Sequence, residues 1–210
     1  GEKKDWDMAE KTLEKVAKEL GIEYEIEEGE AAFYGPKLDY KVKDVIGREW
    51  QLSTVQFDFN LSERFDMTYT NSEGEEVRPF MIHRALFGSF ERFMGLLIEH
   101  YAAAFPLWLS PEQVRILPVS EKFDDYANEV KVALREKGLR VKMISDGGSL
   151  PKRIRNSEKE KIPYVLVVGE KEVADKTVAV RKRKEGDLGA KPLSEFIDQA
   201  VKENAEKINE

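Results

Sequence analysis

The hydrophobic pattern of this 210-residue chain changes at Leu109-Ser110-Pro111, and this change constrains the fold more than any other feature. Before it, short runs alternate between apolar and polar residues and are joined by turn-type residues, as in an antiparallel sheet. After it, strand-like and helix-like runs follow one another, which is typical of a small α/β domain. The sequence therefore predicts an α+β domain at residues 1–109 and an α/β domain with a mixed sheet at residues 110–210.

The expected elements of the first domain are one helix near each end and several strands between them. Apolar residues at helical spacing predict helices over residues 6–20 and 90–101. Alternation predicts strands over residues 22–27, 31–36, 37–43 and 50–59, and a hairpin that joins 65–70 to 77–82.

The second domain is expected to alternate strands with helices. The expected strands cover residues 114–119, 139–144, 164–168 and 177–183. The expected helices cover residues 120–138, 151–160 and 192–209. The continuous apolar run at 164–168 is typical of a strand that is buried on both faces.

Charge balance and the scarcity of cysteine and histidine exclude several kinds of site. The chain has 34 basic and 41 acidic side chains, so its formal charge of −7 argues against binding nucleic acid by bulk charge, although not against a local basic patch. Cysteine is absent and the two histidines are His83 and His100, so this chain alone cannot complete a zinc site of the usual multi-Cys/His type. Charges interrupt its longest apolar stretch and no signal peptide is visible, so we expect a cytoplasmic protein with no membrane partner.

Polar residues gather on the expected strand at residues 50–59, between aromatic ones. Such a strand most often has one wet face. Two glutamines on a central strand, Gln51 and Gln56, also suit recognition of a small polar ligand, because each offers a donor and an acceptor. Tyr34 and Lys37, on a neighbouring strand, could face the same cavity.

The segment from Met81 to Phe93 combines a strand end, a turn and a helix start. By itself, His83 at a strand end is more often structural than a ligand, and Glu91-Arg92 could be only a solvated pair. However, Gly88 permits close approach of the backbone, and Arg92 behind it could reach an anion or stack on a flat base.

This segment, His83-Arg84-Ala85-Leu86-Phe87-Gly88-Ser89-Phe90-Glu91-Arg92-Phe93, resembles motif 3 of class II aminoacyl-tRNA synthetases in its threonyl-tRNA synthetase form. Other stretches resemble the same family in the same order, so the resemblance covers essentially the whole chain. They are residues 32–37 and 50–59 for the late catalytic strands, 105–111 for the exit from the catalytic domain, and 162–172 and 186–189 for the anticodon-binding domain.

The resemblance implies an enzyme that activates threonine with ATP and Mg²⁺ and then transfers it to tRNA(Thr). In this family a zinc ion binds the amino and hydroxyl groups of threonine and so separates it from valine, a strong form of discrimination because an isostere leaves site groups unpaired. His83 aligns with one of the three zinc ligands. Tyr34 and Gln56 align with threonine-contacting residues, and Ser89 lies beside that pocket.

The resemblance also assigns an ATP side to the site. Gln51 aligns with an ATP-side residue, Gly88 with the glycine that lets the nucleotide approach, and Arg92 with the motif 3 arginine that packs on ATP. Lys37 is a candidate for the phosphate or carboxylate side, so Arg92 and Lys37 are the candidate catalytic residues. Such a site works by positioning and by neutralising the charge that develops on phosphate.

In the second domain the resemblance implies recognition of the anticodon by polar and basic residues. The family positions that contact or flank the anticodon are occupied by Arg155, Lys161, Glu172 and Arg181. Hydrogen-bonding and guanidinium groups of this kind suit bases that are splayed from an RNA loop. They belong to a basic patch made of Lys152, Arg153, Arg155, Lys159, Lys161 and residues 181–184, which without the resemblance would be interpreted as two solvated faces.

Two departures from the family pattern matter. Motifs 1 and 2 and the other two zinc ligands, a cysteine and a histidine, precede the segment present here, so we expect a fragment or split half that alone neither binds zinc tightly nor activates threonine. The expected partners are a second copy, as in a homodimeric full enzyme, or another chain that supplies motifs 1 and 2.

The second departure is the loop at residues 145–151, which carries Gly147-Gly148 where the family has an Arg-Asn-Glu-Lys stretch. Lost contacts there should weaken anticodon discrimination. This loop weakly favours the alternative function, a non-catalytic tRNA- or RNA-binding paralogue that kept the anticodon domain. The retained threonine-side and ATP-side residues favour the synthetase.

Overall fold

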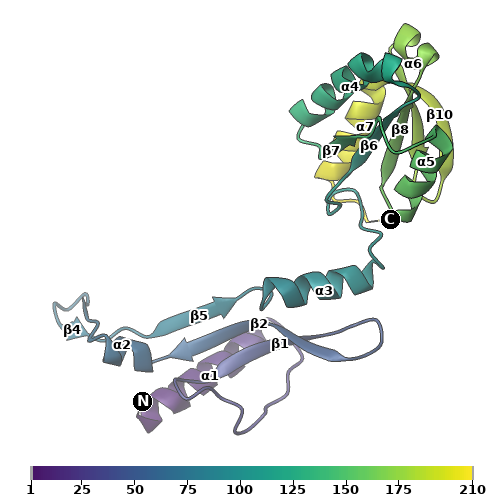
Figure 1. Cartoon of the computed structure of the whole chain (residues 1–210). Coiled ribbons are helices and arrows are strands. Elements are labelled where there is room, and N and C mark those ends of the chain that lie inside the picture. The colour runs from purple at the N-terminus through teal and green to yellow at the C-terminus, as the bar shows by residue number, and fades with distance from the viewer. Residues whose placement is uncertain (1, 210) are drawn as a thin grey trace. The chain divides into compact units, whose positions relative to one another are not determined.

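The computed structural model describes residues 2–209, which form two compact units that divide between His100 and Tyr101 (Figure 1). Residues 101–109 group with the second unit, so the boundary that the sequence places after Leu109 stays a prediction. Within these described residues, no helix is both long and apolar enough to cross a membrane.

The first unit is built on a three-stranded antiparallel sheet with the order β1-β2-β5. The strands are β1 (Lys37–Lys43), β2 (Glu49–Asp58) and β5 (Met81–Ala85). The other elements are α1 (Lys3–Glu19), α2 (Asn60–Arg64), the small hairpin β3 (Tyr69–Thr70) and β4 (Glu76–Val77), and α3 (Phe90–His100). The predicted helices and the strands at 37–43 and 50–59 are therefore confirmed. The predicted hairpin between 65–70 and 77–82 forms only at its tip, where 69–70 pair with 76–77, because residues 81–82 pair with β2 instead.

Two of the predicted strands do not form. Residues 22–27 have the alternating pattern but lie in irregular backbone, and Ile26 is 72% exposed. No strand of the described chain pairs with them, and an unpaired strand leaves its backbone groups without partners. Residues 31–36 contain only an isolated bridge between Ala32 and Gly35.

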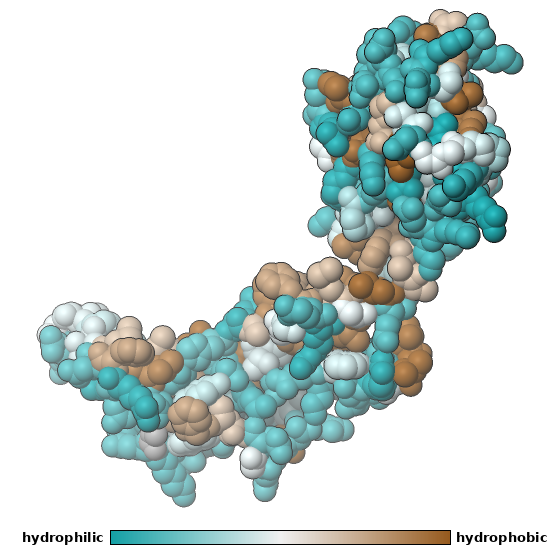
Figure 2. All heavy atoms as spheres, viewed as in Figure 1, coloured by the Kyte–Doolittle hydropathy of each residue, from teal (hydrophilic) through white to brown (hydrophobic). Residues whose placement is uncertain are grey.

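The first unit buries few apolar side chains of its own. Its fully buried ones include Ala9, Ala17 and Phe59, whereas Phe90 on α3 is 84% exposed and Phe33 is 79% exposed. Figure 2 shows apolar side chains, in brown, at the surface of this unit. Soluble proteins rarely expose so much apolar surface without a partner, so the exposed apolar side chains indicate that the hydrophobic core of this unit is incomplete.

The second unit is built on a five-stranded sheet with the order β10-β9-β8-β6-β7. Its mixed character confirms the prediction from the sequence, whereas its edge strand β10 was not predicted. The strand β6 pairs in parallel with β7 and β8, while β9 pairs antiparallel with β8 and β10. The strands are β6 (Val114–Pro118), β7 (Val141–Met143), β8 (Tyr164–Val168), β9 (Thr177–Lys182) and β10 (Gly186–Pro192). The helices are the 3-10 turn η1 (Glu121–Phe123), α4 (Asp124–Glu136), α5 (Leu150–Lys159), α6 (Glu170–Asp175) and α7 (Leu193–Ala205).

Helices cover both faces of this sheet. Alternate residues of β6 point to opposite faces, so Val114 and Ile116 pack into the large core with α4 and α7. Leu117 packs on the other face, against the apolar side of α5. The strand β8 contributes Leu166 to one core and Val165 to the other, which confirms that it is buried on both faces.

A buried arginine ties α5 to the sheet. Arg115 on β6 is 2% exposed, and its guanidinium donates to carboxylate oxygens of Glu112 at 2.5 and 2.8 Å and of Glu160 at 2.5 Å. Burial alone would lower the pKa of Arg115, but these hydrogen bonds raise it, and the bond from Arg115 holds the pKa of Glu160 below its ordinary value. The ion pair therefore fixes the end of α5 against β6.

One member of the predicted basic patch is internal. Arg153 is 5% exposed and donates to the backbone carbonyl of Ile144 at 2.8 Å and to that of Val119 at 3.5 Å. The interpretation of Arg153 as part of a surface patch is wrong, because its side chain satisfies carbonyl groups just beyond the ends of β6 and β7. The exposed cations of α5 include Lys152, Arg155 and Lys159.

Candidate functional site

Three of the predicted site residues meet on the sheet of the first unit. The Tyr34 hydroxyl donates to Oε1 of Gln56 at 2.9 Å. Gln56 on β2 stands opposite His83 on β5 in the antiparallel register. The rings of Tyr34 and His83 lie edge to face with their centroids 6.1 Å apart. The sequence-predicted threonine side and the predicted zinc ligand therefore come together from three separate segments.

An unpredicted carboxylate holds His83. Asp58 at the end of β2 is 1% exposed, and its Oδ2 lies 2.6 Å from Nε2 of His83. Its Oδ1 accepts the backbone amides of Asn60 at 2.8 Å and Leu61 at 2.9 Å, at the start of α2. Burial opposes the charge on Asp58, but these bonds outweigh it and keep the pKa of Asp58 below its ordinary value.

These side chains line a concavity of about 410 Å³, a size that suits a small ligand. Its lining residues are Phe33, Tyr34, Gln56, Asp58, Asn60, Leu61, Arg64 and His83. Sequence reasoning missed Asp58 as a member of the site. The available signal was its position two residues after Gln56, since residues at i and i+2 of a strand share a face.

A β-bulge brings Gln51 to the same face as Gln56. Tyr40 of β1 pairs with Ser53, but the next residue, Lys41, pairs with Gln51, so one residue of β2 is skipped. This extra residue reverses the alternation, as a bulge next to a functional site often does to re-aim a side chain. Gln51 then donates through Nε2 to Oδ1 of Asp39 at 2.6 Å.

Asp39 gathers the polar groups at this end of the sheet. Its Oδ2 accepts Lys37 Nζ at 2.6 Å and its Oδ1 accepts Thr54 Oγ1 at 2.8 Å, in addition to Gln51. The pairing of Lys37 with Asp39 leaves its predicted role toward phosphate or carboxylate as a prediction. Lys37, predicted for the phosphate or carboxylate side, and Gln51, predicted for the ATP side, therefore share one carboxylate.

Arg92, Ser89 and Gly88 lie where β5 passes into α3. The Arg92 guanidinium donates to the carbonyl of Gln51 at 3.1 Å and sits over the Trp50 ring, 5.9 Å from its centroid. The Ser89 hydroxyl accepts the Arg92 amide at 3.2 Å, and Ser89 is not among the residues that line the concavity. Gly88 has φ +69°, and a Cβ there would come within 3.2 Å of the Leu52 carbonyl, so the backbone itself also favours glycine.

The donor set for a metal is partial within residues 2–209. No three His, Cys, Asp or Glu side chains of this stretch are grouped so that they could hold an ion. His83 fits one ligand position, because one ring nitrogen is engaged by Asp58 and no partner to the other is found among the described residues. The remaining donors of a zinc site would have to come from outside this stretch.

The predicted anticodon residues lie on three elements of the second unit. Arg155 is exposed on α5, Arg181 on β9 pairs with Asp187 at 2.9 Å, and Oε2 of Glu172 accepts the Gly169 amide at 2.9 Å at the start of α6. Lys161 follows α5 and donates to the Ala102 carbonyl. No hydrogen bond or ion pair joins these four to one another in the described chain, so their joint role stays a prediction.

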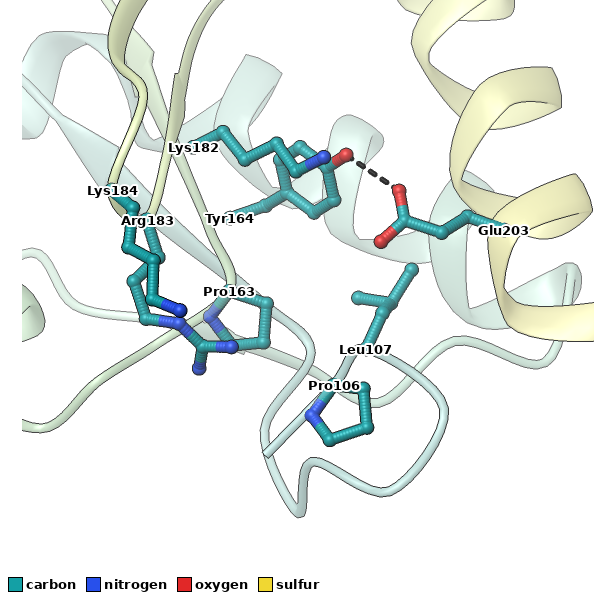
Figure 3. A pocket seen from close by; sticks show the side chains of 8 residues that line it. All are labelled: Pro106, Leu107, Pro163, Tyr164, Lys182, Arg183, Lys184 and Glu203. Carbon is teal, nitrogen blue, oxygen red and sulfur yellow. Dashed lines mark hydrogen bonds between the residues drawn. The ribbon is translucent and has the colours of Figure 1, made fainter. Parts of the chain in front are cut away.

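A small cavity of about 20 Å³ lies elsewhere in the second unit, and Figure 3 shows the side chains around it. Its lining includes Tyr164, whose hydroxyl donates to Glu203 at 2.7 Å, and Arg183, which donates to the carbonyls of Lys161 and Phe105. This volume holds about one water molecule, so the cavity is a packing feature. Arg183 was predicted to belong to the basic patch, but its guanidinium binds backbone carbonyl groups of the second unit and so has a structural role.

Comparison with known proteins matches each unit to a family model. Residues 3–101 match the tRNA synthetase class II core domain (G, H, P, S and T), and residues 113–204 match the anticodon binding domain. The two units therefore match the two kinds of domain, a catalytic core and an anticodon-binding domain, that class II aminoacyl-tRNA synthetases combine.

Individual relatives narrow the family. The chain is 54% identical to a threonine–tRNA ligase of Thermus thermophilus over 207 residues, 99% of this chain and 31% of that protein. It is 53% identical to that of Clostridioides difficile over 97% of this chain and 32% of that protein. The structure of the RNA binding domain of threonyl-tRNA synthetase from Cryptosporidium parvum is similar, with a TM-score of 0.87 and 35% identity over 96% of this chain and 51% of that chain.

The chain belongs to the threonyl-tRNA synthetase family and corresponds to the C-terminal part of its members. It spans about a third of the length of the curated relatives it matches. The sequence-based recognition of the family is therefore confirmed.

Proposed function

We propose that this chain works as part of a threonine–tRNA ligase, which activates threonine with ATP and transfers it to tRNA(Thr). The observation that carries the proposal is the meeting of Tyr34, Gln56 and His83 at one concavity. A hydroxyl, an amide and an imidazole offer both donors and acceptors, as recognition of a hydroxylated amino acid requires.

On the threonine side, these residues bind and orient the amino acid. Tyr34 and Gln56 hold each other, so each keeps a defined direction before the substrate arrives. His83 would be one ligand of the family's zinc ion, which when bound supplies a Lewis acid for the amino and hydroxyl groups of threonine. Ser89 is proposed to flank this pocket.

On the ATP side, Arg92 would direct positive charge at the nucleotide, and Lys37 at a phosphate or at the carboxylate of the substrate. Mg²⁺ would bind the same phosphates when ATP is present. Arg92 is placed by the Gln51 carbonyl and the Trp50 ring, so its guanidinium is fixed for stacking or for an anion. Such fixed charges favour the pentavalent phosphate because they need no rearrangement during reaction. Gln51 and Gly88 complete the proposed ATP side.

The second unit is proposed to bind tRNA(Thr) at the anticodon through Arg155, Lys161, Glu172 and Arg181. The match of residues 113–204 to the anticodon binding domain supports this role. A second candidate, a non-catalytic tRNA- or RNA-binding paralogue, is favoured by the altered loop at 145–151, of which residues 145–149 precede α5. Gly147 and Gly148 there adopt φ +96° and +104°, so the loop has glycine conformations in place of side chains that could read bases.

Removal of the Arg155 guanidinium tests tRNA binding. Arg155→Ala should weaken binding of tRNA(Thr) by about 5- to 150-fold, the equivalent of the ~1–3 kcal/mol that one stacked base contributes. The measurement is fluorescence anisotropy of a labelled tRNA(Thr) transcript at several salt concentrations.

The matched control is Lys137→Ala, which removes one exposed cation after α4, on the opposite face of the sheet from α5. It should leave the affinity nearly unchanged. Equal losses from both variants would mean that only bulk charge matters, and would contradict a specific site on α5.

A further inference from the structure

We propose that Asp58 is a positioning residue: it fixes the proton of His83 on Nε2 and leaves Nδ1 as the lone-pair donor for a metal ion. The metal in this statement rests on the proposed function. The placement of the proton does not, because it follows from contacts within this chain.

The first step is the geometry of the carboxylate. Oδ2 of Asp58 lies 2.6 Å from Nε2 of His83, a distance typical of a strong charge-assisted hydrogen bond. A carboxylate only accepts hydrogen bonds, so the shared proton must be carried by the imidazole nitrogen. In a neutral ring the other nitrogen then has no proton and can donate its lone pair.

The second step is that Asp58 cannot turn away. Its other oxygen accepts the amides of Asn60 and Leu61, which are the first donors of α2, and the residue is 1% exposed. Both oxygens are therefore committed, one to the helix start and one to His83. A partner fixed in this way sets the tautomer and ring orientation of a metal-binding histidine.

The third step is that His83 is otherwise lightly held. Its side chain is 37% exposed at the concavity, and the contact of its ring with the Tyr34 ring is only edge to face. Since Asp58 is the residue that binds a ring nitrogen of His83 within residues 2–209, it decides which nitrogen faces a ligand.

The same geometry predicts the effect of Asp58→Asn. The amides of Asn60 and Leu61 need an acceptor, so the side-chain oxygen of asparagine stays on them and its NH₂ takes the place of Oδ2. That NH₂ donates to Nε2, which moves the imidazole proton to Nδ1. An analogous wrong tautomer arises when the aspartate of the serine protease triad is changed to asparagine.

The experiment is ¹⁵N NMR of the histidine side chains in the full chain, at a pH that leaves both imidazole rings neutral. The chain has two histidines, so the His100→Gln variant assigns the signals of His83. In the unchanged chain, we expect the tautomer with the proton on Nε2 to outnumber the Nδ1 tautomer by about tenfold or more. In Asp58→Asn, we expect the Nδ1 tautomer to predominate. No metal or substrate is present, so this result is independent of the proposed enzymatic function.

The matched control is Asp66→Asn, the same change at a carboxylate that is 90% exposed and paired with Arg78. It should leave the His83 signals unmoved. A proton on Nδ1 in the unchanged chain, or a tautomer that Asp58→Asn does not shift, would overturn the proposal. Because the unchanged chain gives the first answer by itself, the test does not depend on how well the variant folds.

Discussion

Replacing both Glu112 and Glu160 by glutamine is expected to lower the free energy of unfolding of the second unit by about 3 kcal/mol. The double change leaves Arg115 charged, 2% exposed and without a counter-charge. The loss stays near the lower end of the usual range because each glutamine oxygen still accepts one hydrogen bond. The free energy of unfolding is measured by urea titration, with hydrogen exchange of the β6 and β8 backbone amides as the readout.

The matched control is the triple variant that adds Arg115→Met. Removing the buried charge together with its partners should recover most of the lost stability, because an apolar side chain of similar length fills the same space. The pKa of Glu160 is lowered in the folded chain, so its contribution is present above its ordinary pKa and lost as pH falls. The gap between parent and double variant should therefore shrink below about pH 4.3. An unchanged gap at low pH, or a triple variant as unstable as the double, would count against this account of Arg115.

Gly35→Ala is expected to lower the free energy of unfolding of the first unit by at least about 3 kcal/mol, because overpacking and backbone strain act together. A Cβ at Gly35 would lie 2.0 Å from the carbonyl oxygen of Phe57, and neither backbone can move without separating β1 from β2. The adjacent bond from the Phe57 amide to the Pro36 carbonyl, at 3.0 Å, would be lost as well. Amide hydrogen exchange should show lost protection along β1 and β2, and the Tyr34 contact with Gln56 should be lost with it.

Gly47→Ala is the control for this prediction. Gly47 also has a positive φ, +86°, but a Cβ there would meet no atom within 4 Å. It should cost only about 1–2 kcal/mol, from the left-handed conformation alone. Equal effects at the two positions would show that conformation, and not the close approach to Phe57, explains the need for Gly35.

Periodicity predicted the elements that have partners inside the chain. The run Tyr164–Val168 became the central strand β8 because parallel and antiparallel neighbours were available on its two sides. Residues 22–27 have an equally regular pattern and form no strand, since alternation describes a half-buried face and does not supply the neighbour that would pair with it.

The site was predictable in composition but less so in geometry. The polar residues of β2 were visible, yet plain alternation would put Gln51 and Gln56 on opposite faces, and a bulge that has no simple sequence signal reverses this. Arg153 shows the converse problem. Its place in a run of cations predicts a surface role, but its side chain is buried and donates to backbone carbonyls beyond the strand ends. The family roles of all the site residues stay predictions. For Lys37, Ser89, Lys161 and Glu172, the contacts seen in the structure serve the fold.

The central claim is that this chain holds part of a threonine site that other residues of the enzyme complete. The most direct test is threonine-dependent ATP–pyrophosphate exchange by a hybrid in which this chain replaces the matching 31% of the Thermus thermophilus relative, measured beside the isolated chain. We expect exchange by the hybrid, a loss of about 100-fold or more in its Gln56→Ala variant, and none by the isolated chain. Exchange by the isolated chain, or a folded hybrid no more active than that chain, would contradict the claim.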